Sequence, residues 1–172
     1  MALLLTHIPA AEDDDAIARF SQANPGWRVE YTAAGVLSLS PTFSDSGPRD
    51  AEAAGQLRDF AKKVGGKVFG SSTGFRIPGA GLKSPDAAWI SAEHLGRLTR
   101  AEMQKFWTVC PDVVIEILSE TDSWSELQAK LREYRQSGAI YALSIDPYRR
   151  DTYELGEKPA ALQLDIDAII DA

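Results

Sequence analysis

The chain has 172 residues, 44% of them hydrophobic and 25% charged, which is the composition of one ordinary globular domain. No apolar run approaches the roughly 20 residues that a membrane helix needs, and the sequence contains no internal repeat or low-complexity linker. We therefore expect a single domain over residues 1–172 without a membrane span. The net charge of −7 is unfavourable for a nucleic-acid-binding protein, because phosphate contacts require basic side chains.

Cysteine and histidine are too sparse for several kinds of site. The single cysteine, Cys110, cannot form an internal disulfide, which suits a reducing cytoplasm. The two histidines, His7 and His94, are far apart and have no ligand-like spacing. These features argue against a zinc site, a histidine-metal nuclease and a Ser-His-Asp hydrolase.

Basic residues are concentrated in one part of the chain. Between Arg49 and Lys83 there are seven Lys and Arg against three Asp and Glu, a local charge of +4, so the rest of the chain carries −11. Such a stretch can be a solvated face or a surface that follows a phosphate backbone. Charge alone does not distinguish the two.

The first part of the chain predicts a helix, a hairpin and a second helix. Residues 12–23 form an amphipathic pattern stopped by Asn-Pro-Gly, and alternating residues in 27–31 and 36–40 predict the hairpin. A loop rich in Ser, Thr and Gly spans 41–48. Apolar residues at helical spacing then predict a helix over 49–64, closed by two glycines.

The second part predicts a sheet with helices on it. We expect strands at 67–70, 73–77 and 83–90, a helix at 97–107, a strand at 113–118, a helix from 124 to 138, and strands at 140–146 and 152–155. Ser123 and Glu126 have the spacing of a capping box. The strand, helix and strand from 113 to 146 imply parallel strands joined by a crossover. The fold class is therefore α/β (α+β), a mixed sheet flanked by helices with an N-terminal hairpin.

Glu116 is the anomaly of the sequence, because it lies inside the apolar run Val-Val-Ile-Glu-Ile-Leu. An unpaired carboxylate buried there would cost roughly several kcal/mol. Glu116 shares a strand face with Val114 and Leu118. A cation, a metal ion or a proton must compensate it.

The following helix supplies a cation. Leu127, Leu131 and Tyr134 form an apolar stripe that should face the sheet, and Lys130 lies within that stripe. A buried ammonium and a buried carboxylate explain each other. A purely structural Glu–Lys pair is the alternative, although such pairs often cost more than they return.

A second acid should come from a neighbouring strand. Asp112 shares a strand face with Glu116, but four residues of strand span about 13 Å, too far for direct ligands of one Mg²⁺ at ~2.1 Å. Asp86, in Ser-Pro-Asp, opens or bends such a strand. Taken alone, Pro-Asp usually marks a turn.

Segments that match a known protein family run through nearly the whole chain. They are Asn24-Pro25, Arg28-Val29-Glu30, Ser71-Ser72-Thr73-Gly74-Phe75-Arg76, Ser84-Pro85-Asp86-Ala87-Ala88-Trp89, Cys110-Pro111-Asp112-Val113-Val114-Ile115-Glu116, Asp122-Ser123, Glu126-Leu127-Gln128-Ala129-Lys130, Tyr134, Gly138 and Asp146-Pro147. In their order and spacing they resemble the Uma-type family of bacterial restriction-endonuclease-like proteins.

The resemblance implies the PD-(D/E)XK nuclease fold, with Asp86 as the first acid and Glu116 as the second. The usual lysine position holds Leu118, so the resemblance suggests that Lys130 has taken its place on the helix. Glu30 matches the family's first-strand glutamate and could add a carboxylate, but its polar alternation equally suits a solvated face. Glu52 is a further candidate, because an N-terminal-helix glutamate joins the site in some nucleases of this fold. A departure at Ala33-Ala34-Gly35 affects only a turn.

These observations predict a DNA endonuclease that uses Mg²⁺, with Mn²⁺ as a substitute. Asp86 and Glu116 would hold the metal and Lys130 would assist the chemistry. We also expect a homodimer, since duplex cleavage by a small one-site nuclease usually needs two sites. The alternative is a catalytically silent nuclease-fold module for binding or assembly through a protein partner, which the net charge of −7 favours.

Overall fold

The computed structural model describes residues 7–41 and 46–172. Its elements, in chain order, are α1 (Asp14–Ala23), β1 (Trp27–Tyr31), β2 (Leu37–Pro41), α2 (Ser46–Val64), β3 (Lys67–Gly70), β4 (Phe75–Ile77), β5 (Gly81–Lys83), β6 (Ala87–Ile90), α3 (Ala92–Leu95), β7 (Val113–Ile117), α4 (Trp124–Gln136), β8 (Tyr141–Asp146), β9 (Asp151–Gly156) and α5 (Ile166–Asp171).

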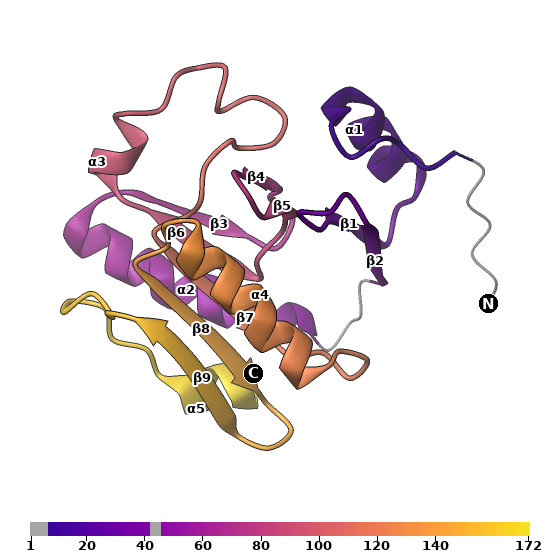
Figure 1. Cartoon of the computed structure of the whole chain (residues 1–172). Helices are drawn as coiled ribbons and strands as arrows, with labels where there is room; N and C mark the ends of the chain where they lie inside the picture. The colour runs from indigo at the N-terminus through magenta and orange to yellow at the C-terminus, as the bar shows by residue number, and fades with distance from the viewer. Residues whose placement is uncertain (1–6, 42–45) are drawn as a thin grey trace.

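Two sheets form the framework (Figure 1). The larger has the strand order β3-β6-β7-β8-β9, in which β7 and β8 are parallel and all other neighbours antiparallel. The smaller sheet, β2-β1-β5-β4, is antiparallel and contains the N-terminal hairpin. The predicted class is confirmed: an α+β fold with a mixed sheet flanked by helices.

The large sheet is covered on both faces, as its apolar strands predict. Every residue of β7 and of β8 is buried. One core cluster joins α2 and α5 to one face through side chains such as Val113 and Ile115. The other joins α4 to the opposite face through Val114 and Ala142, and the alternation places Glu116 on this α4 side.

The chain crosses from the small sheet to the large one at Ser84, Pro85 and Asp86, between β5 and β6. Residues 83–90, expected as one strand, are therefore two. At the start of β5, Gly81 has φ +84°, and a Cβ there would lie 2.2 Å from the carbonyl oxygen of Tyr31. Glycine is thus required for β5 to pair closely with β1 in the small sheet.

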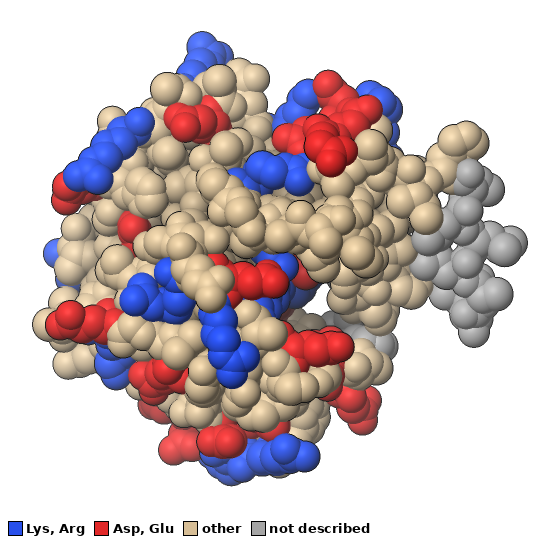
Figure 2. All heavy atoms as spheres, viewed as in Figure 1, with Lys and Arg blue, Asp and Glu red and all other residues tan. Residues whose placement is uncertain are grey.

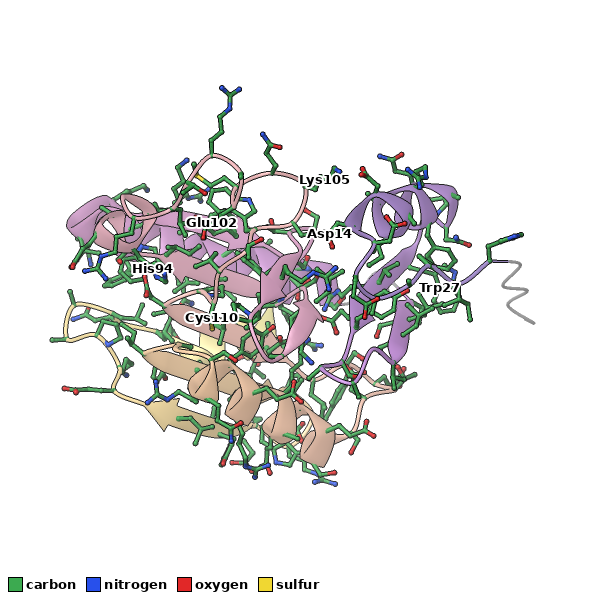
Figure 3. All side chains as sticks on the ribbon, turned by 45° about the horizontal axis from the view of Figure 1, so that its top comes forward. Asp14, Trp27, His94, Glu102, Lys105 and Cys110 are labelled. Atoms are coloured by element: carbon green, nitrogen blue, oxygen red, sulfur yellow. The ribbon has the colours of Figure 1, made fainter. Side chains whose placement is uncertain are left out.

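The predicted helix over 97–107 is wrong. The structure has only the short α3, capped by Ser91, and then turns and bends. Trp107 exchanges backbone hydrogen bonds with Gly74 and Arg76, and Lys105 pairs with Asp15 of α1. Figure 3 shows Lys105 beside α1. These tertiary contacts outweigh the local helical pattern.

Smaller differences occur at element ends. Helix α2 begins at Ser46, inside the loop expected over 41–48, of which residues 42–45 lie outside the described part of the chain. Ser123 makes no side-chain capping bond to the backbone and instead contacts the Ser125 hydroxyl at 2.9 Å. Helix α5 was not predicted. No helix in residues 7–41 and 46–172 is both long and apolar enough to cross a membrane.

Candidate active site

The two predicted acids lie on adjacent strands. Strands β6 and β7 pair Ala87 with Ile115, and one further step in this register places Asp86 opposite Glu116. Asp86 Oδ2 also accepts a hydrogen bond of 2.7 Å from the Ile117 amide. Residues directly opposite each other typically have Cβ atoms about 5 Å apart. The bend at Pro85 thus delivers a carboxylate to the side of Glu116.

Lys130 and Tyr134 of α4 hold Glu116 from above the sheet. Lys130 Nζ lies 2.9 Å from Glu116 Oε1, and the Tyr134 hydroxyl donates to the same oxygen at 2.8 Å. The Glu116 side chain is only 2% exposed. Burial raises the pKa of Glu116 to about 7, with help from Asp86 and against the lowering by Lys130. The carboxyl group is therefore easily protonated near neutral pH.

Glu30 joins the same group from the small sheet. Its Oε1 accepts from Lys130 Nζ at 3.0 Å and from the Ser84 amide at 2.5 Å. Burial alone would raise the pKa of Glu30, but Lys130 and the amide more than offset it and hold the pKa below its ordinary value. Lys130 is thus shared by carboxylates from both sheets, and its pKa is raised despite burial. The ammonium keeps its charge.

Arg28 and Asp50 complete the group, and the sequence reasoning gave neither a role. Arg28 Nη1 lies 2.8 Å from Asp86 Oδ1, and its Nη2 lies 3.8 Å from Asp50 Oδ2. Among the described residues, the buried Asp50 Oδ1 has no hydrogen-bond partner, while a hydrogen bond from Ser71 to the carboxyl group lowers its pKa. Burial, followed by the charge of Asp86, raises the pKa of Asp50 to about 7.

A sequence signal for Asp50 existed. It precedes Ala53, Leu57 and Phe60 by three, seven and ten residues, so it continues the buried stripe of α2 by one turn. Its position within an apolar stripe is the same signal that identifies Lys130. Arg28 had no such signal beyond its place in β1.

These side chains line one cavity of about 310 Å³ at the seam between the two sheets, which we call the seam cavity. Its charged residues are Arg28, Glu30, Asp50, Asp86, Glu116, Asp122, Glu126 and Lys130. Serines of β2 and of the loop before α4 line much of the rest, including Ser38, Ser40 and Ser119.

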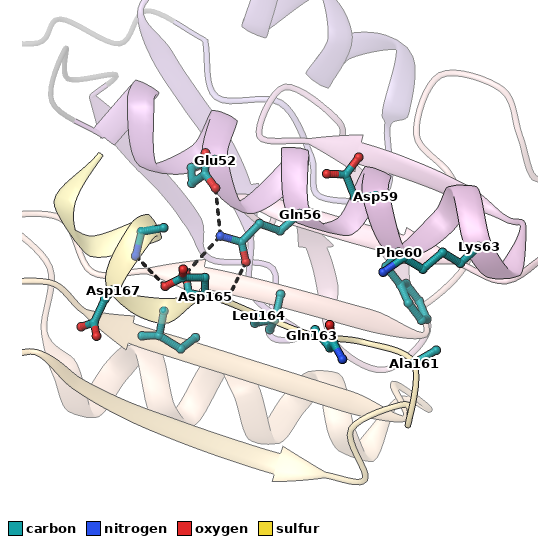
Figure 4. Close-up of a pocket in the computed structure, with 12 residues that line it drawn as sticks. Glu52, Gln56, Asp59, Phe60, Lys63, Ala161, Gln163, Leu164, Asp165 and Asp167 are labelled. Atoms are coloured by element: carbon teal, nitrogen blue, oxygen red, sulfur yellow. Dashed lines mark hydrogen bonds between the residues drawn. The ribbon is translucent and has the colours of Figure 1, made fainter.

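Glu52 does not lie in this cavity. It accepts a hydrogen bond of 2.9 Å from Gln56 in an open groove between α2 and α5, where Gln56 also bonds both backbone groups of Asp165 (Figure 4). Asp112 is likewise elsewhere: its carboxylate accepts from the Ser91 amide and contacts the His94 ring. These bonds fix the turn into α3.

The donor set fits a hard divalent cation. Mg²⁺ prefers carboxylate oxygens and keeps several waters, so Asp86 and Glu116 could hold it, with Asp50 Oδ1 as a third oxygen in need of a partner. In the side-chain conformations of the described residues, no three His, Cys, Asp or Glu side chains form a group that could hold a metal ion. The carboxylates are instead turned onto Arg28 and Lys130.

The basic stretch does not form one surface. Lys83 is buried against Glu133, Lys62 pairs with Asp59, and Arg76 pairs with Asp14. Figure 2 shows Lys and Arg interspersed with Asp and Glu over the visible face. Two of these pairs, Lys83–Glu133 and Arg76–Asp14, use acids from outside the stretch, so half of its +4 excess is paired within the fold.

Comparison with known proteins agrees with this architecture. No curated protein sequence matches the chain. A solved structure described as "a putative nuclease belonging to DUF820" from Anabaena variabilis ATCC 29413 superposes with a TM-score of 0.67 at 18% identity, covering 90% of this chain and 97% of the other. At this identity the likeness shows the fold alone. The model of the Uma2 family, described as "Putative restriction endonuclease", matches residues 13–160. The chain therefore belongs to the Uma2 family and has a nuclease-like fold.

Proposed function

We propose that the protein is a divalent-metal-dependent nuclease that hydrolyses phosphodiester bonds of DNA at the seam cavity. The observation that supports this most is that Glu116 is buried opposite Asp86 and forms an ion pair with Lys130. All three side chains line a cavity that solvent can enter. Buried charges are costly, and they gather where chemistry needs them.

Each residue has a distinct task in this proposal. Asp86 and Glu116 would hold Mg²⁺ or Mn²⁺. The metal would act as a Lewis acid on a phosphate oxygen and lower the pKa of a bound water. Lys130 would orient that water or stabilise negative charge that develops on the phosphate, while Glu30 fixes the ammonium from the other side. Tyr134 holds the Glu116 carboxylate in place.

A second candidate is a silent binding or assembly module. It is favoured by the pairing itself: Asp86 and Glu116 already have a built-in cation each, and the net charge is −7. In this case the ion pairs only tie the two sheets and α4 together.

Cleavage assays separate the two functions. We expect the wild type to cut plasmid or oligonucleotide DNA with Mg²⁺ or Mn²⁺ and not with EDTA. Glu116→Gln should abolish cleavage. Glu133→Gln is the matched control, because Glu133 is an ion-paired glutamate of α4 that does not line the seam cavity. Cleavage that survives in Glu116→Gln would contradict the proposed site.

A homodimer in a reducing cytoplasm is part of the proposal. A protein with one site per chain needs two copies to cut both strands of a duplex in one encounter. Trp89 and Trp107 contribute to the core and give the dimer no support, whereas Trp124 remains half-buried at the start of α4. Light scattering at high micromolar concentration tests the mass, and a monomer there would exclude the dimer.

A further inference from the structure

We propose that Arg28 is the phosphate-binding residue of the seam cavity, and that Asp86 holds either its guanidinium or a divalent cation, so that metal binding turns Arg28 toward the substrate. The inference rests on the proposed function, because it concerns the same metal and the same substrate.

Competition for Asp86 follows from its contacts. Oδ2 accepts from the Ile117 amide at 2.7 Å, and Oδ1 lies 2.8 Å from Arg28 Nη1. A Mg²⁺ ion binds carboxylate oxygens at ~2.1 Å, so on Oδ1 it would lie within a few ångströms of the guanidinium. Two cations on one oxygen repel each other strongly in a buried site. The metal and Arg28 therefore compete for Asp86 in this arrangement.

Arg28 is the cation that can move. Lys130 is 15% exposed and is enclosed between Glu116 and Glu30 at 2.9 and 3.0 Å. Arg28 is 23% exposed and reaches Asp50 only at 3.8 Å. Its backbone is fixed by pairing with β2, so a change of side-chain rotamer into the cavity suffices.

A phosphate group is the partner that suits a released guanidinium. Arginine offers a planar fork of donors that matches phosphate oxygens. Among the described residues that line the cavity, the only cations are Arg28 and Lys130, and Lys130 is already held by two carboxylates. Ser38 and Ser40 lie on the same wall as Arg28 and can donate to an anion.

Manganese binding tests the competition. Bound Mn²⁺ is measured through the electron paramagnetic resonance signal of free Mn²⁺. Binding is assigned to this site when the wild type or Arg28→Met binds Mn²⁺ and the additional change Asp86→Asn abolishes that binding. We expect Arg28→Met to bind at least about tenfold more tightly than the wild type, because the competing charge is gone while the stem still packs. The control is Arg76→Met, which removes an arginine of similar exposure, 22%, from an ion pair outside this cavity. It should match the wild type.

Oligonucleotide binding tests the second half. With Ca²⁺ as a metal that supports binding, we expect Arg28→Met to bind a labelled DNA oligonucleotide about tenfold more weakly, with a salt slope smaller by about one. Arg76→Met should change neither value. If Arg28 has only a structural role, Arg28→Met should lower the stability of the fold without raising the affinity for Mn²⁺. Unchanged DNA binding would overturn the role on phosphate.

Arginine side-chain NMR tests the wild type directly, in case Arg28→Met does not fold. Saturating Mg²⁺ should shift the Nε–H resonance of Arg28, assigned with Arg28→Lys, and leave that of Arg76 in place. An unmoved Arg28 resonance, or equal Mn²⁺ affinity in Arg28→Met, overturns the inference while the metal-dependent function stands. No Mn²⁺ bound at Asp86 by the wild type or by Arg28→Met overturns the function itself, and the inference with it.

Discussion

Helix α2 contributes acidic side chains to two different hollows of the molecule. Asp50 faces the seam cavity, whereas Glu52, two residues later, faces the open groove beside α5. In the groove Glu52 is bonded to the neutral Gln56, and the neighbouring charges are solvated. In the seam cavity Asp86 and Glu116 are buried, and no described residue bonds the buried Asp50 Oδ1. The number of acids does not mark a site; buried charge without full compensation does.

The largest expected effect concerns Lys130. Lys130→Met should reduce metal-dependent cleavage by about 10²-fold or more, the scale of losing a charge-stabilising group. The fold should stay nearly intact, because methionine keeps the apolar packing of the lysine stem. Adding Glu116→Gln should gain little stability and leave cleavage absent. Urea unfolding and cleavage assays on the wild type, both single variants and the double variant measure this.

The opposite pattern would favour the silent module. It consists of no cleavage by the wild type on any DNA or RNA, together with a loss of about 3–5 kcal/mol in Lys130→Met that Glu116→Gln restores. The seam cavity would then resemble the groove in carrying no chemistry.

A pH dependence should distinguish the two hollows next. The folded-state pKa of Glu116 is raised to about 7 from an ordinary 4.5, so its contribution to stability is full below pH ~4.5 and is lost as the pH rises through 7. The free energy of unfolding in EDTA should therefore fall by about 2–3 kcal/mol from pH 5 to 8. The raised pKa of Asp50 lowers the free energy of unfolding in the same direction as the pH rises. The pKa of Glu30 is lowered, so its contribution to stability is lost only as the pH falls below about 4.5.

Chemical denaturation at several pH values checks this slope. Glu116→Gln should flatten most of it, whereas Glu52→Gln should leave the slope as it is in the wild type. A wild type whose stability is constant from pH 5 to 8 would show that Glu116 is ionised throughout.

Asp50 and Glu52 allow the comparison to be made on one helix. Asp50→Asn should reduce cleavage by about tenfold and raise the free energy of unfolding at pH 8 by about 1 kcal/mol, because a repelled buried charge is removed. Glu52→Gln should change stability by less than about 0.5 kcal/mol and leave cleavage intact. Equal effects of the two changes would remove the distinction between the hollows.

The smallest effect is expected at Ser144, which lies opposite Glu116 across β7 and β8 and whose buried hydroxyl has no hydrogen-bond partner among residues 7–41 and 46–172. Ser144→Ala should be neutral or stabilise the protein by up to about 1 kcal/mol, because an unsatisfied polar group is removed. Thermal unfolding measures it. A loss of more than about 1 kcal/mol would show that the hydroxyl has a partner in solution.

Local patterns predicted the large sheet well and the seam poorly. The buried runs of β7 and β8 and the stripe of α4 are periodic, so the sequence identified them and the Glu116–Lys130 pair. The stretch 97–107 is held by contacts with β4 and α1, which no local pattern contains. The contact between Arg28 and Asp86 likewise joins two sheets, so it depends on tertiary docking and could not be predicted from either segment.

The ion pair between Glu30 and Lys130 joins residues 100 positions apart in the chain. Closing so long a loop is entropically unfavourable until the elements at both ends are formed. Glu30 of the β1–β2 hairpin therefore gains its contact with Lys130 only once α4 is formed, and the core of the large sheet can assemble first. The residues that line the seam cavity would thus come together late in folding, after the core of the large sheet.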